Sequence, residues 1–69
     1  MTTIEAITRE ANKYNLNLAV EKLANKVYSG LNEAGIPNFI LNDRYITVGT
    51  QKYQFIRNRA KGEWTVKEY

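Results

Sequence analysis

The hydrophobic residues change their spacing at the chain's only proline, Pro37. Before Pro37 they recur every three or four residues, as in an amphipathic helix, and after it they alternate with polar residues, as in a β-strand. The pattern therefore predicts an α+β fold, with a helical N-terminal half and a β-rich C-terminal half.

The second of two expected helices, over about residues 16–34, has the clearest pattern. Its apolar stripe runs through Leu16, Val20, Leu23, Val27, Leu31 and Ala34. Gly35 suits the left-handed residue that ends a helix, Ile36 can contact the last apolar turn, and Pro37 cannot continue it. We expect this stripe to pack against a sheet.

The first helix is expected over about residues 3–14. Thr2 and Glu5 match a capping box, in which each side chain bonds to the backbone of the other residue. Asn15 and Asn17 compete for helical backbone bonds, so a kink or short break is expected between the two helices.

Three or four short antiparallel strands are expected over about residues 38–69. Asn42-Asp43 and Gly49-Thr50 suit two-residue hairpin turns, and residues 59–62 suit a longer loop. These turns predict a core face with Phe39, Leu41, Ile46, Val48, Tyr53, Phe55, Trp64 and Val66. They predict an opposite face with Ile40, Tyr45, Thr47, Lys52, Gln54, Ile56, Thr65, Lys67 and Tyr69.

Composition limits the chemistry that such a domain can perform. Its 69 residues form one small domain, residues 1–69, and contain neither histidine nor cysteine. The commonest general base, the thiol nucleophile and the usual zinc ligands are therefore missing. The four glycines form no phosphate-binding loop. We expect no enzyme activity, no cofactor and no metal site.

The net charge of +3 resides in the β-rich half. Residues 37–69 hold six Lys or Arg and three acids, whereas residues 1–36 hold four of each. Candidate phosphate contacts are Arg44, Lys52, Arg57, Arg59 and Lys61. The alternative interpretation is a solvated hairpin tip, where cations protect a sheet edge from pairing.

The face opposite the core is more apolar than a water-facing sheet usually is. Its candidate partner-binding residues are Ile40, Tyr45, Lys52, Gln54, Ile56 and Lys67. Three interpretations stay open: the first helix covers this face, a partner or a second copy in a homodimer covers it, or it binds single-stranded nucleic acid.

We therefore expect a small non-catalytic inhibitor or regulator, of the kind that phages and mobile elements often encode, which docks on a host protein through its sheet face and basic hairpin. The alternative is a basic nucleic-acid-binding regulator that contacts phosphates through the second and third strands and the loop after the third. No segment suits a membrane span or a signal peptide, so we expect a cytoplasmic protein.

Overall fold

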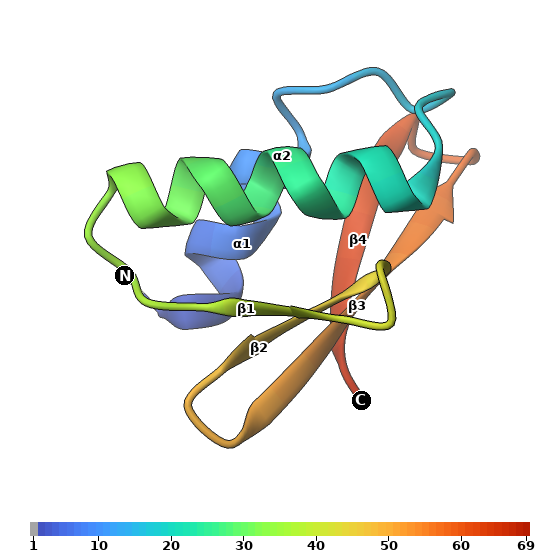
Figure 1. Ribbon diagram of the computed structural model, residues 1–69. Helices are drawn as coiled ribbons and strands as arrows, with labels where there is room; N and C mark the ends of the chain where they lie inside the picture. Colours follow the sequence, from blue (N-terminus) through green and yellow to red (C-terminus); the bar gives the residue numbers. More distant parts are fainter. Residues whose placement is uncertain (1) are drawn as a thin grey trace.

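Two helices pack against a four-stranded antiparallel sheet in the computed structural model, which describes residues 2–69 (Figure 1). The elements are α1 (Thr3–Ala11), α2 (Val20–Glu33), β1 (Phe39–Leu41), β2 (Tyr45–Val48), β3 (Gln51–Asn58) and β4 (Glu63–Glu68). The strands lie side by side in chain order, as a meander. The expected α+β architecture is confirmed, with four strands.

The helices are shorter than expected, and a longer connection joins them. The Thr2 hydroxyl accepts a hydrogen bond from the Glu5 amide at 3.3 Å, which confirms the Thr2 half of the predicted capping box. The helix nevertheless ends at Ala11, and α2 begins only at Val20. In the connection, the Asn15 side chain accepts from the Asn17 amide at 2.7 Å. The expected break between the helices is therefore present, but it spans residues 12–19 and begins three residues before Asn15.

The C-terminal end of α2 has the predicted Schellman geometry. Gly35 has φ +81°, and the Ile36 amide donates to the Leu31 carbonyl at 2.9 Å. This turn directs the chain back towards β1.

A single core lies between the helices and one face of the sheet. Its buried apolar residues are Ile7, Ala11, Leu23, Ala24, Val27, Leu31, Ile46, Tyr53, Phe55, Trp64 and Val66. Because both helices and the inner sheet face contribute to this one cluster, α1 does not cover the opposite face. The interpretation that α1 folds across that face is wrong.

The two later hairpins have the predicted register. Val48 pairs with Gln51 around the Gly49-Thr50 turn, and Gly49 has the positive φ of +63° that its position requires. Asn58 pairs with Glu63 across the four-residue loop.

The register between β1 and β2 differs from the prediction by one residue. Asn42 and Asp43 do turn the chain, with φ of 53° and 61°, and the Arg44 amide donates to the Leu41 carbonyl at 3.2 Å. Arg44 is then left unpaired, because Leu41 pairs with Tyr45. One extra residue on one strand moves every side chain of β1 to the opposite face.

This shift corrects the predicted face of all three β1 residues. Ile40 pairs with Ile46 and packs against the core, so its assignment to the partner-binding face is wrong. Phe39 and Leu41, which were expected in the core, lie on the opposite face, and Phe39 is 70% exposed.

Candidate functional site

The sheet face that the helices leave uncovered is the first candidate site, and we call it the outer face. Its residues are Phe39, Leu41, Tyr45, Thr47, Lys52, Gln54, Ile56, Thr65, Lys67 and Tyr69. The pairing confirms that Tyr45, Lys52, Gln54, Ile56 and Lys67 share one face.

The outer face is more aromatic than the sequence indicated. Phe39 and Tyr69 are the exposed large hydrophobic residues of the described chain, at 70% and 63%. The rings of Tyr45 and Tyr69 stack with centroids 4.8 Å apart and planes 13° apart. Tyr69 is held at this position because its amide donates to the Lys52 carbonyl at 2.9 Å. Sequence reasoning missed Phe39, and only the β1 register could have identified it.

The five candidate phosphate-binding cations do not form one patch. Lys52 is the second residue of β3 and lies on the outer face, whereas Arg59 and Lys61 lie in the loop after β3. Seven residues of extended chain place Lys52 about 20 Å from Arg59. That separation exceeds the Debye length of about 10 Å at 0.1 M salt, so these charges act separately on a ligand.

Arg57 has a structural role in the core layer. Its Nε donates to the Leu16 carbonyl at 2.7 Å, and its Nη2 donates to the Leu18 carbonyl at 2.8 Å. The guanidinium also lies over the Trp64 ring, 4.9 Å from the centroid. Arg57 therefore holds the connection between the helices against β3 and is not free to contact phosphate.

Arg44 is engaged on the helical side of the molecule. Its Nη2 lies 3.2 Å from Oε2 of Glu21, with both side chains about half exposed. The pKa of Glu21 is lowered, first by its own backbone amide and then by Arg44. An exposed pair of this kind contributes little to stability. It does place Arg44 near α2, away from the outer-face aromatics.

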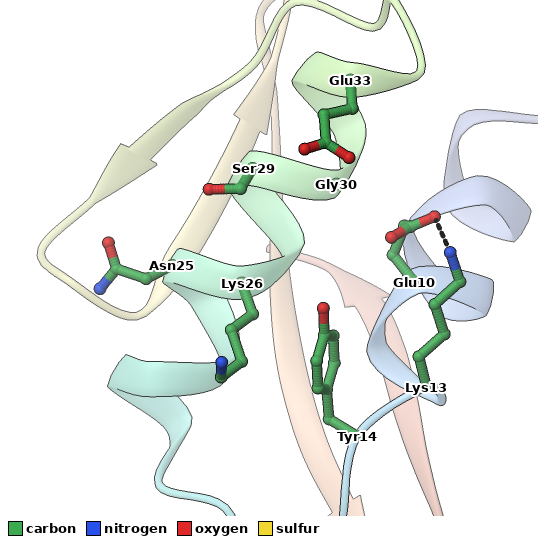
Figure 2. Close-up of a pocket in the computed structure, with 8 residues that line it drawn as sticks. All are labelled: Glu10, Lys13, Tyr14, Asn25, Lys26, Ser29, Gly30 and Glu33. Carbon is green, nitrogen blue, oxygen red and sulfur yellow. Dashed lines mark hydrogen bonds and ion pairs between the residues drawn. The ribbon is translucent and has the colours of Figure 1, made fainter.

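A polar pocket between α1 and α2 is the second candidate site, and Figure 2 shows the residues that line it. Its volume is about 420 Å³. Lys13 donates to Glu10 at 2.9 Å, and this hydrogen bond and charge raise the pKa of Lys13. Lys26 lies over the Tyr14 ring, 5.5 Å from its centroid. Both cations are thus already engaged with protein groups.

The close approach of Glu10 to α2 explains a glycine inside that helix. A Cβ at Gly30 would collide with the Glu10 carboxylate, which is only 14% exposed. This side of the pocket is therefore formed by the packing of Glu10 against α2.

Within residues 2–69, no group of three or more Asp or Glu side chains could hold a metal ion. No helix in that range is long and apolar enough to cross a membrane. Comparison with known proteins adds nothing: no family model matches this chain, and no curated protein or solved structure matches it.

Proposed function

We propose that this protein is a small non-catalytic inhibitor or regulator that docks on another protein through its outer face. One observation carries the proposal: Phe39 is 70% exposed on a sheet face that no other part of the described chain covers. An exposed apolar patch of this kind is typical of an interaction surface.

The arrangement of the outer face supports a protein partner. Aromatic and aliphatic side chains lie beside one another in the rows that pair Leu41 with Tyr45 and Phe39 with Thr47. Lys52, Gln54 and Lys67 border them on the β3 and β4 side. Apolar anchors next to polar residues are the usual composition of an interface hot-spot region, in which Tyr is enriched.

Affinity capture from the native cell extract tests this proposal. The tagged wild-type protein is compared with a Phe39→Ser, Tyr69→Ser double variant, which removes both exposed anchors. The matched control replaces two exposed helix residues, Lys22→Ser and Asn25→Ser. Urea unfolding of each variant verifies that its fold is intact.

The expected result is a partner protein that the wild type and the helix control retain and that the outer-face variant loses. The loss should be at least about 10-fold, because truncating two hot-spot anchors costs more than about 1 kcal/mol each. Equal retention by all three proteins would show that the outer face is not the docking surface.

A nucleic-acid-binding regulator is the second candidate function, favoured by the stacked rings of Tyr45 and Tyr69 between Lys52 and Lys67. Exposed aromatic rings on a sheet can stack bases, and lysines can contact phosphates. Two phosphate contacts predict a log–log salt dependence of about −2 for the binding constant. Fluorescence anisotropy with single-stranded and duplex DNA and RNA at two salt concentrations tests this candidate. No binding at about 10 μM protein and low salt would remove it, since nonspecific binding, roughly 1–100 μM at physiological salt, becomes tighter as salt falls.

A further inference from the structure

β4 is an edge strand of the sheet, as β1 is, and one of its edges presents backbone groups without a neighbouring strand. In the order β1-β2-β3-β4, β4 has a partner on one side only. In an antiparallel strand, successive residues direct their backbone groups to opposite sides. The Tyr69 amide donates to the Lys52 carbonyl of β3, so the backbone N–H and C=O groups of the odd-numbered β4 residues point towards β3. The backbone groups of Trp64, Val66 and Glu68 therefore point to the free edge.

The backbone groups of Trp64 are already hydrogen-bonded to a side chain, in the way that a neighbouring strand would bond to them. The Asn12 side chain accepts from the Trp64 amide at 2.8 Å and donates to the Trp64 carbonyl at 3.1 Å. A single carboxamide thus satisfies both backbone groups of Trp64. Within residues 2–69, no side chain or turn makes a corresponding hydrogen bond to Val66 or Glu68.

A groove runs along this edge between α1 and β4. Its volume is about 560 Å³. The residues that line it are Ile4, Glu5, Thr8, Arg9, Lys61, Glu63, Trp64, Thr65 and Val66. Ile4 and Val66 supply apolar contact, and the charges of the lining balance, with Arg9 and Lys61 against Glu5 and Glu63. Because Val66 is one of the lining residues, the groove adjoins its unpaired backbone groups, and the other lining side chains would contact an added strand.

We propose that the β4 edge and this groove bind an extended peptide segment of a partner protein by strand addition. Main-chain hydrogen bonds to Val66 and Glu68 supply affinity for any extended peptide, whatever its sequence. Contacts to the peptide side chains, which alternate between the two faces of the sheet, supply the selectivity. A peptide residue opposite Val66 points to the core side, towards Ile4, and should be apolar. Its neighbour opposite Lys67 points to the outer side and should be acidic.

A second copy of this chain is a poorer occupant than such a peptide. The antiparallel register that uses both Val66 and Glu68 in both copies pairs each Val66 with the other Glu68. It also places the two Lys67 side chains directly opposite each other, and like charges in that position are destabilising. Lys67 thus disfavours self-pairing and favours an acidic residue at the same place.

Peptide selection followed by two backbone-specific variants tests the proposal. The wild-type protein is used to select from a displayed library of random decapeptides, and the strongest binder is synthesised with a fluorophore. Its affinity is measured for Glu68→Pro and Glu68→Ala. Both variants lose the same charge, but only proline removes the outward amide, and proline is tolerated at an exposed strand edge.

The expected selected sequences alternate acidic and apolar residues, and Glu68→Pro should bind about 3- to 10-fold more weakly than Glu68→Ala. An N-methyl group on the peptide amide that pairs with β4 should weaken binding to the wild type by a similar factor, and this arm does not depend on the folding of a variant.

Equal binding by the two Glu68 variants and by the N-methylated peptide would overturn the proposal. The proposal would also be overturned if light scattering showed that the wild type is a dimer and that Glu68→Pro is a monomer. The edge would then bind a second copy of this chain. This site is separate from the outer face. If the peptide binds the Phe39→Ser, Tyr69→Ser variant but not Glu68→Pro, strand addition is supported, whatever the outcome for the outer face. If it binds Glu68→Pro but not the Phe39→Ser, Tyr69→Ser variant, strand addition is overturned and the proposed function stands.

Discussion

Replacing Arg57 by alanine should destabilise this protein more than any other change at a cation. The side chain donates to the Leu16 and Leu18 carbonyls at 2.7 and 2.8 Å and covers the Trp64 ring. Hydrogen bonds to charged groups contribute about 1.5–3 kcal/mol each, and an exposed cation–π contact about 0.5–1 kcal/mol. Because Arg57 is partly exposed, we take the lower end and expect a loss of about 3 kcal/mol.

That loss is large for a domain of this size. At about 0.05–0.15 kcal/mol per residue, the free energy of unfolding of the whole chain is about 3–10 kcal/mol. A loss of 3 kcal/mol should lower the Tm by about 12–24 °C. Arg57→Lys keeps the charge but cannot present a two-pronged donor, so it should lose about half as much.

Urea unfolding followed by Trp64 fluorescence measures these differences. Arg59→Ala is the matched control, since Arg59 is exposed in the following loop and should change stability by less than about 0.5 kcal/mol. If Arg57→Ala and Arg59→Ala were equally stable, the structural role assigned to Arg57 would be refuted. Arg57 would then again be a candidate phosphate contact.

Three further changes test other contacts. Asn12→Ala should cost about 2 kcal/mol in unfolding free energy, because it removes two hydrogen bonds to Trp64. Hydrogen exchange of the Trp64 amide should accelerate in that variant, and an unchanged rate would contradict the edge contact. Gly30→Ala should be nearly neutral in the wild type, where Glu10 must move, but stabilising by about 1 kcal/mol in a Glu10→Ala background. A double-mutant cycle measures that difference, and additive effects would exclude the contact. The folded-state pKa of Glu21 is lowered, so its carboxylate stabilises the fold above the unfolded-state pKa of about 4.3 and loses that effect as pH falls. The stability difference between wild type and Glu21→Gln should therefore be present at pH 7 and absent near pH 3, and a difference that persists there would contradict it.

Local chemistry was sufficient to predict several elements. The Thr2 cap, the Gly35 turn and the Gly49-Thr50 hairpin all follow from residues within one turn of each other, and all are confirmed. Glycine at a positive φ and a hydroxyl at a helix start act over a few atoms, so distant parts of the chain hardly alter them.

The outer face was only partly predictable. The outer-face residues of β2, β3 and β4 were predicted correctly from two turns of standard length. Those of β1 depended on whether Leu41 pairs with Arg44 or with Tyr45. The structure leaves Arg44 unpaired and places Ile40 against the core. A turn sequence specifies its central residues and does not specify whether an extra residue follows them.

The interpretation of single charges also required the tertiary structure. Arg57 lies in a run of cations that resembles a solvated hairpin, yet its partners are carbonyls some 40 residues earlier in the chain. Asn12 lies inside the helix that the sequence predicted over residues 3–14, yet its side chain closes part of the β4 edge. Such long-range polar contacts have no periodic signal in a sequence.

The sequence by itself determined the order of helices and strands, the amphipathic stripe of α2 and the absence of histidine and cysteine chemistry. These depend on spacing, composition and local turn residues. Only the tertiary structure decided which face of β1 meets the core, whether α1 covers the outer face, and how far the β4 edge is closed. Those outcomes depend on how the chain fills one small core, and a shift of one residue exchanges the buried face of a strand for the exposed one.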